Sequence, residues 1–557
     1  MVAIARLTPL VRPPVHGLLV VATVFLAYAC ASRPSVCTAA PQLKSIFPTG
    51  VQVGGSVEVE ASGKFEKWPV QVWVDRPGLE LLPAKEKAKF TAKAAAEAEP
   101  GVYWIRLFDG QGTTPPFPVV VGSLPEIAER EPNDRPGQAN EVALPSAILN
   151  GKLARRGDVD TFSVQLAKGQ TLVAEVDANR TLESPVDCLL EIATTSGFVQ
   201  ARNEDHQGLD PRLTFVAPQD GRYLVRVFGF PATPDSTIGL AGGENYHYRL
   251  LLTVEGFVDS TWPLAISAVG EQVEVNGWNL PNGVKMLTPA ATTNAGTTAV
   301  VAPGIANRFL VPVARHASIP ALPGSSPQQP QTITLPATVT GRIAAVRESH
   351  SFNFNAAAGT TVVFRIESRE LGFPLDPILE LFDAAGKSLV RIDDLANGRD
   401  AELVFAIPAA GDYRLTVSDL HRHGGPRFLY RLRGTLAQPD YALSLAADAF
   451  SVAAGNQLEI PVKVDRLYGF NQPVVVRVDG LPPTLQVEPV TSPADGDLSK
   501  EVKLILKAGD MPFAGPIQVT GSVAGAENFG RQAVATITGR IAKTSQPWLT
   551  ITPPAKQ

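Results

Sequence analysis

The chain has 557 residues, of which 45% are apolar, and its formal net charge is −5. One hydrophobic core cannot organise a chain of this length, so several domains are expected. The mildly acidic balance, without a block of basic residues, argues against nucleic acid or an anionic membrane surface as the partner.

Residues 1–31 have the pattern of an export signal. Arg6 and Arg12 precede an apolar run at 17–29, GLLVVATVFLAYA, and small residues follow it. The run is shorter than the ~20 residues that a membrane span needs. We therefore predict a cleaved signal peptide and an extracytoplasmic protein that is secreted, periplasmic or at the cell surface. The alternatives are an uncleaved membrane anchor and a lipid on Cys30, which would then be the chain's attachment to a membrane.

The cysteine content excludes a disulfide framework. Cys30 and Cys37 lie at or near the export signal, and Cys188 is then left without a partner or a CxxC motif. Its setting, PVDCLLEI, predicts a small buried apolar side chain.

The region 41–124 predicts a first β-sandwich, similar in size to one immunoglobulin-like domain. Segments such as SVEVEA, VQVWVD and VYWIRLFD alternate between apolar and polar residues, which is typical of half-buried strands. Only 84–101 has a helix-like composition. Its apolar residues make no 3.6-residue stripe, so we predict a strand followed by a loop.

An internal repeat organises the centre of the chain. The segment SPVDCLLEIATTSGFVQARNED at 184–205 aligns with FPLDPILELFDAAGKSLVRIDD at 373–394. Likewise, DTFSVQLAKGQTLV at 160–173 aligns with HSFNFNAAAGTTVV at 350–363. The nearly constant offset predicts two domains of one fold. We name them repeat 1 (125–257) and repeat 2 (331–437).

The remaining regions are also rich in strand patterns. Residues 258–330 predict a partial β module that ends in the linker ALPGSSPQQPQ. Residues 438–541 predict a last sandwich, and 542–557 predict a tail. The predicted fold class is all-β, with tandem antiparallel β-sandwich modules joined by short linkers.

Repeat 1 resembles the bacterial pre-peptidase C-terminal domain. The resemblance rests on EPND at 131–134, GDVDTF at 157–162, GQTLV at 169–173, SPVDC at 184–188 and APQDGRYLVRV at 217–227. Repeat 2 resembles the same family more loosely, while the first and last modules resemble an IPT/TIG domain and another immunoglobulin-like fold. The whole arrangement is similar to large secreted proteins of planctomycete-type bacteria. The resemblance implies β-sandwiches with a non-catalytic accessory or adhesion role, and it names no substrate.

The segment EREPND is rich in oxygen ligands. Glu129, Glu131, Asn133 and Asp134 place four oxygen-bearing side chains within six residues. Calcium takes about six to eight oxygen ligands, whereas zinc and copper prefer softer ones that are missing nearby. Downstream, GDVDTF places two aspartates on the strand face that also carries an apolar core. Two such carboxylates repel each other unless a cation lies between them.

The resemblance implies that these two pieces meet at one calcium site in repeat 1. The candidate ligands are Glu129, Glu131, Asn133, Asp134, Asp158 and Asp160. From residue types alone, the same residues also fit a solvated turn between domains, and both interpretations stay open here.

Repeat 2 departs from this pattern. Glu348 and His350 stand at the two aspartate positions, and LPGS stands where EPND is expected. We therefore predict calcium in repeat 1 only. Asp187 and Asp376, in SPVD and FPLD, occur in both repeats and predict turn caps, because such side chains bond nearby backbone amides.

The sequence contains no recognisable catalytic motif. None of its seven histidines forms HExxH, and GxSxG, a P-loop and a dinucleotide fingerprint are all missing. His421 and His423 in HRHGG, and His206 in NEDHQGLD, fit solvated turns better than metal ligands. We predict no catalytic residues and no organic cofactor.

Two functions of different classes remain. In the first, the chain is an exported non-catalytic scaffold that binds an extracellular polymer or protein surface. In the second, it is an accessory or targeting subunit of a secreted peptidase, or an extracellular hydrolase built from scattered acids. Flat sandwiches would favour the first function, and a deep acidic cleft would favour the second.

Overall fold

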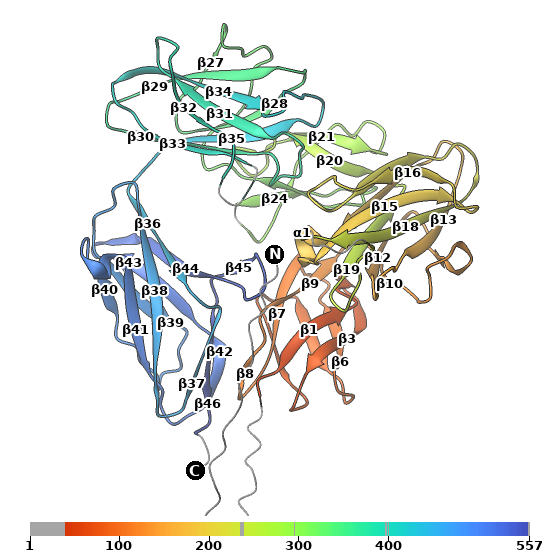
Figure 1. Cartoon of the computed structure of the whole chain (residues 1–557), viewed down its shortest axis with the longest axis horizontal. Coiled ribbons are helices and arrows are strands. Elements are labelled where there is room, and N and C mark those ends of the chain that lie inside the picture. Colours follow the sequence, from red (N-terminus) through yellow and green to blue (C-terminus); the bar gives the residue numbers. More distant parts are fainter. Residues whose placement is uncertain (1–38, 234–238, 295, 396–397, 399, 555–557) are drawn as a thin grey trace, which may run out of the picture. The chain divides into compact units, whose positions relative to one another are not determined.

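The structure is a computed structural model that describes residues 39–233, 239–294, 296–395, 398 and 400–554. The predicted signal peptide, with Cys30 and Cys37, lies outside these residues. The regular secondary structure of the described chain is almost entirely β-strand, which confirms the predicted fold class (Figure 1). Across these ranges, no helix has the length and apolar character needed to span a bilayer.

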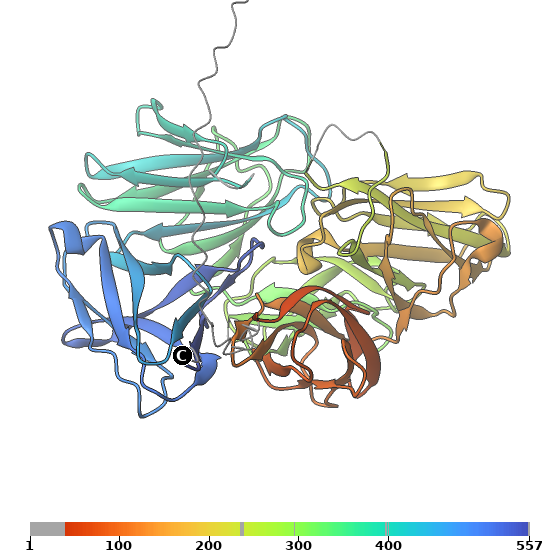
Figure 2. The same ribbon diagram turned by 60° about the horizontal axis from the view of Figure 1, so that its bottom comes forward.

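The first module packs two sheets around one apolar core (Figure 2). One sheet has the order β1 (Gln42–Phe47), β3 (Ser56–Lys64), β6 (Lys89–Ala94), β5 (Leu79–Pro83). The other has the order β2 (Gly50–Gln52), β9 (Phe117–Gly122), β7 (Gly101–Asp109), β4 (Gln71–Val74), with β8 (Gly112–Thr113) beside β7. The helix-like stretch 84–101 forms β6 and a loop, as predicted, because Phe90, Ala92 and Ala94 alternate into the core.

Repeat 1 has two five-stranded sheets that enclose one core. The first sheet has the order β10 (Glu126–Ala128), β12 (Ser146–Lys152), β19 (His247–Thr253), β14 (Thr171–Asp177), β17 (Arg212–Val216). The second has the order β11 (Asn140–Glu141), β13 (Asp160–Leu166), β18 (Gly221–Pro231), β15 (Val186–Thr194), β16 (Val199–Asn203). Two short helices, η1 (Pro136–Gln138) and α1 (Asn179–Leu182), lie in its loops. Cys188 is fully buried in this core as a free thiol, as predicted.

Repeat 2 has the same strand order. Its first sheet runs β26 (Ser318–Pro320), β28 (Ala337–Arg342), β35 (Leu429–Leu436), β30 (Thr361–Glu367), β33 (Glu402–Ala406). Its second runs β27 (Gln331–Thr332), β29 (Ser349–Ala356), β34 (Gly411–Asp419), β31 (Pro377–Phe382), β32 (Ser388–Ile392). In both repeats the short first strand of each sheet pairs in parallel with its neighbour.

The region before repeat 2 differs from the predicted partial module and linker. It contains two three-stranded sheets with a small core. They are β20 (Phe257–Trp262), β21 (Val273–Trp278), β22 (Met286–Leu287) and β23 (Ala290–Ala291), β24 (Thr297–Val300), β25 (Phe309–Pro312). Repeat 2 also starts earlier than residue 331, because β26 pairs with β28 and Ala321 packs into the core of repeat 2. The Pro/Ser/Gln-rich segment is thus a loop inside repeat 2, equivalent to the EREPND loop.

The last module also differs at its end. Its large sheet runs β40 (Val490–Ser492), β39 (Val474–Asp479), β43 (Gln518–Val523), β44 (Ala526–Thr536), β36 (Asp440–Leu445), β38 (Gln457–Leu467), β41 (Glu501–Lys507), with β45 (Lys543–Thr544) beside β44 and η2 (Asp497–Ser499) in a loop. Its small sheet is β37 (Ala449–Ala453), β46 (Trp548–Thr552), β42 (Phe513–Pro516). The predicted tail at 542–557 is therefore wrong over β46, which is a central strand because Trp548, Leu549 and Ile551 are buried.

Buried aspartates cap one turn in each repeat, but they are not the predicted ones. Asp210 accepts hydrogen bonds from the amides of residues 178–180, at 2.8–3.2 Å. Asp400 accepts from the amides of residues 368–370, at 2.9–3.1 Å. Asp187 lies inside β15 and Asp376 just before β31, and no described backbone amide donates to either carboxylate. The prediction of caps at Asp187 and Asp376 was therefore wrong for the described residues.

One tyrosine in each repeat lies over a glycine of the neighbouring strand. A Cβ atom on Gly151 would lie 2.0 Å from Cζ of Tyr248, and one on Gly341 would lie 2.1 Å from Cζ of Tyr430. Both tyrosines are fully buried. The two glycines are needed because each ring occupies the volume that a side chain would fill.

We expect Gly341→Ala to destabilise repeat 2 by about 1–3 kcal/mol, the usual cost of overpacking a core. Hydrogen–deuterium exchange of β28 and β35 in the full chain would measure the loss. Gly221→Ala is the matched control, because a Cβ there meets no atom within 4 Å. Equal protection of β28 and β35 in Gly341→Ala and the wild type would contradict the prediction.

Candidate metal centre

The candidate site lies where the loop after β10 crosses the start of β13. The loop carries Glu129, Glu131 and Asn133, and Asp160 is the first residue of β13. The backbone amide of Lys152, at the end of β12, donates to Oε1 of Glu129 at 2.6 Å. The pairing of β10 with β12 thus sets the position of the first acidic side chain.

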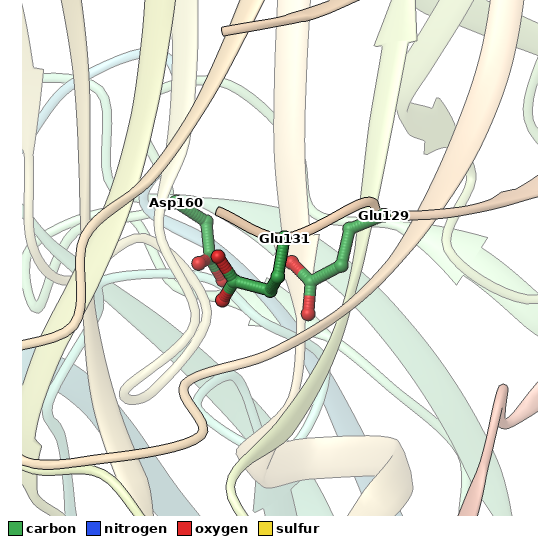
Figure 3. A group of neighbouring side chains, drawn as sticks. All are labelled: Glu129, Glu131 and Asp160. Atoms are coloured by element: carbon green, nitrogen blue, oxygen red, sulfur yellow. The ribbon is translucent and has the colours of Figure 1, made fainter. Parts of the chain in front are cut away.

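Three carboxylates converge at this point. One oxygen each from Glu129, Glu131 and Asp160 lies within 4.8 Å of the others, and Figure 3 shows the three groups facing one another. Asp160 is fully buried, Glu129 is half-buried and Glu131 is exposed. The group is thus open to solvent on one side and anchored in the core on the other.

Tyr248 supports the buried end of this group. Its hydroxyl donates to Oδ2 of Asp160 at 2.6 Å and lies 3.4 Å from Oε2 of Glu129. The space for the ring comes from Gly151 in β12. Our sequence analysis missed this role. The available signal was the alignment of YHYRL in repeat 1 with FLYRL in repeat 2, which retains one tyrosine.

Two buried oxygens in the site lack partners. Oδ1 of Asn133 and Oδ1 of Asp160 form no hydrogen bond within the described part of the chain, although both residues are fully buried. The amide of Asn133 donates to Oε2 of Glu131 at 2.9 Å, and its Nδ2 lies 3.5 Å from Oε2 of Glu129. Buried acceptors without a donor are costly, and both become satisfied if they coordinate a cation.

The other two predicted ligands are oriented toward an arginine. Nη2 of Arg155 donates to both carboxylate oxygens of Asp134, at 2.7 and 3.0 Å, and Nη1 donates to Oδ1 of Asp158 at 3.0 Å. Asp158 also accepts from the amide of Ala154 at 2.5 Å. The structure therefore brings Glu129, Glu131 and Asp160 together around Asn133, and it places Asp134 and Asp158 beside them as partners of Arg155.

The protonation of the site follows from burial and repulsion. Burial raises the pKa of Asp160 to about 10, with the nearby carboxylate of Glu129 adding to the shift. Burial also raises the pKa of Glu129 to about 7. Burial alone would raise the pKa of Asp134, but the hydrogen bonds and positive charge of Arg155 outweigh it, so the pKa of that carboxyl is lowered. Without a cation, Asp160 therefore keeps its proton at neutral pH, and a cation bound at this buried end of the site would displace that proton.

In repeat 2 a histidine occupies the equivalent place. Nδ1 of His350 lies 2.7 Å from the hydroxyl of Tyr430, and its Nε2 lies 3.3 Å from Oε1 of Glu348. Burial lowers the pKa of His350. His350 contacts Tyr430 as Asp160 contacts Tyr248 in repeat 1. Repeat 2 thus has an imidazole where repeat 1 has the buried carboxylate of its candidate metal site.

The remaining histidines do not form a second centre. The amides of His421 and His423 both donate to Oδ2 of Asp419, which is a turn arrangement. His206 differs from the predicted surface loop, because its side chain is only 15% exposed and its ring lies 3.0 Å from Nη1 of Arg212. Glu129, Glu131 and Asp160 are the one metal-compatible group of His, Cys, Asp and Glu side chains in the described ranges.

Parts of the chain are similar to a known bacterial domain family and to a probable protease. Residues 348–419, in repeat 2, match the family described as the bacterial pre-peptidase C-terminal domain. The chain is also 27% identical over 238 residues to a probable subtilase-type serine protease of Deinococcus radiodurans. That alignment covers 42% of this chain and 26% of the relative, so the chain spans about a quarter of the protease's length.

Two solved structures are similar to parts of the chain. The pre-peptidase C-terminal domain of collagenase from Bacillus anthracis is 19% identical, with 19% of this chain and 93% of that one covered and a TM-score of 0.16. The periplasmic lysozyme inhibitor PliG of Aeromonas hydrophila is 15% identical, with 22% and 99% covered and a TM-score of 0.16.

Proposed function

We propose that this chain is an exported, non-catalytic scaffold or binding protein of a secreted peptidase system, and that calcium stabilises repeat 1. The observation that carries the proposal is the group of three facing carboxylates with two orphaned buried oxygens, on Asn133 and Asp160. All of its donors are oxygens, which suit a hard cation such as calcium.

The residues that would hold the ion are Glu129, Glu131, Asn133 and Asp160. When bound, calcium supplies two positive charges that neutralise the carboxylates. These residues come from the β10 loop and from β13, which belong to different sheets of repeat 1. Their joint binding would tie one sheet to the other and stiffen the module outside the cell.

The link to a peptidase rests on two findings. The family match within repeat 2 and the subtilase-type relative both connect the chain with secreted proteases. We extend the family to repeat 1, because its strand order equals that of repeat 2 and it carries the EPND and GDVDTF motifs. The first and last modules would be IPT/TIG-like and immunoglobulin-like spacers. A mature chain that begins after residue 31, detected by mass spectrometry of the exported protein, would support export.

A calcium titration of the full chain tests the metal proposal. We expect calorimetric binding heat and a raised melting temperature of repeat 1 at millimolar calcium. Glu131→Ala and Asp160→Asn should both abolish the effect. Glu141→Gln is the matched control, because this exposed glutamate pairs with Arg222 outside the site. No heat and no thermal shift in the wild type would leave EREPND as a loop of repeat 1 that binds no calcium.

A further inference from the structure

The outward face of the first sheet differs between the two repeats. In repeat 1, Val173 and Leu251 are buried there in a cluster with Phe257. The alignment of β14 with β30, and of Tyr248 in β19 with Tyr430 in β35, defines the equivalent positions of the two repeats. Leu251 of repeat 1 thus corresponds to Arg433 of repeat 2, whose side chain is 48% exposed. At this position a buried leucine of repeat 1 is replaced by a half-exposed arginine in repeat 2, which adds a positive charge to the face.

Three arginines converge on one buried carboxylate at this face. Glu367 in β30, with a side chain only 6% exposed, accepts from Nε of Arg431 at 2.6 Å and from Nη2 of Arg433 at 2.7 Å. Nε of Arg365 lies 3.6 Å from the same carboxylate, and its Nη2 donates to Glu370 at 2.7 Å. Glu367 therefore holds the guanidinium groups in place before any ligand arrives, which lowers the ordering cost of binding.

A cavity of about 630 Å³ opens over these arginines. Its lining adds Arg315, an exposed residue that has no ion-pair partner among the described residues. Four arginines, His316 and a single acid, Glu402, line the cavity, and none of its lining side chains is Phe, Tyr or Trp. Glu402 lies 3.7 Å from Nη1 of Arg365, so the cavity offers several guanidinium groups against one lining carboxylate.

We propose that this groove binds an acidic segment of a polypeptide, through Arg315, Arg365 and Arg433. Guanidinium groups match carboxylates in planar two-bond geometry. Arg365 and Arg433 stand opposite each other on the paired strands β30 and β35, and their side chains are 31% and 48% exposed. Acidic side chains two residues apart in an extended peptide share one face, so two carboxylates of a polypeptide can face these two arginines together. This inference is independent of the calcium site.

Titration of the full chain with a hexaglutamate peptide, in EDTA and at low salt, tests this groove. We expect binding that weakens steeply as salt is raised, and no binding of a hexaglutamine peptide. Arg433→Leu, which installs the residue of repeat 1, and Arg315→Gln should each weaken binding by about tenfold or more. Arg315→Gln is the variant least prone to misfolding, because Arg315 is exposed and forms no ion pair within the described ranges. Arg391→Gln, an exposed arginine on the other sheet of repeat 2, should bind as the wild type does.

Three outcomes would overturn the proposal. One is no binding of hexaglutamate by the wild type at millimolar concentration. Another is binding that both groove variants retain. The third is tighter binding of polygalacturonate, with the same dependence on Arg315 and Arg433, which would assign the groove to an anionic polysaccharide instead.

Discussion

In calcium-free buffer, repeat 1 should lose about 2 kcal/mol of unfolding free energy as the pH rises from 7 to 8.5. The cause is Asp160, whose pKa is about 10 in the folded chain and near 3.8 when unfolded. Over this range the folded state keeps a proton that the unfolded state has lost, so the linkage lowers stability with rising pH. One retained proton corresponds to about 1.4 kcal/mol per pH unit.

This pH range separates Asp160 from other groups. Glu129 and Asp210 have pKa values of about 7, so most of their effect on the unfolding free energy falls below pH 7. The Cys188 thiol, whose pKa burial raises, contributes mainly above it. Urea unfolding followed by hydrogen exchange in β13 and β19 would measure the slope. Asp160→Asn, which keeps an acceptor for Tyr248, should flatten the slope, and so should saturating calcium. A wild-type slope that persists in Asp160→Asn would assign it to another residue.

Replacing Asp400 with alanine should destabilise repeat 2 by on the order of 3–5 kcal/mol. Asp400 is 1% exposed and is the shared acceptor for the amides of Ser368, Arg369 and Glu370. Its loss leaves the buried amide of Ser368 without a partner, which costs about 1–3 kcal/mol, and removes two part-buried bonds from Arg369 and Glu370, each contributing about 1 kcal/mol. The turn between β30 and β31 should therefore open first.

Hydrogen–deuterium exchange over residues 368–370 in the full chain would show the effect directly. Asp400→Asn keeps one acceptor oxygen and should lose less stability than Asp400→Ala. Asp394→Ala, at an exposed position nearby, is the control that should leave the exchange unchanged. If Asp400→Ala and Asp394→Ala behave alike, the three amide bonds contribute little to stability.

Strand alternation was sufficient to predict the fold class and to place β6, because alternation depends only on residues adjacent in sequence. The linker at 321–331 and the tail were misread because their strands are short, proline-flanked and stabilised by partners far away in the chain. The capping role of Asp210 and Asp400 depends on loops about 30 residues away, which no local pattern reveals.

The candidate site shows the same limit. The resemblance to the pre-peptidase C-terminal domain, added to their oxygens and strand face, implied Glu129, Glu131 and Asp160 as ligands, and the structure brings them together. Tyr248 reaches them from β19, 88 residues after Asp160. Arg155 forms ion pairs with Asp134 and Asp158. Sequence spacing could not show that these two acids face an arginine while the other predicted ligands face the candidate metal site.

The central place of β46 affects the order in which the chain can finish folding. Because the chain emerges N-terminus first, from the ribosome or from an export channel, both repeats are complete before Trp548–Thr552 appear. Until then β37 and β42 have no strand between them, and each exposes an unpaired edge. Such edges recruit other chains, so the nascent last module is the part most open to mispairing. Its closure by β46 is a late step, and the protein becomes resistant to aggregation only after nearly all of the described chain has been made.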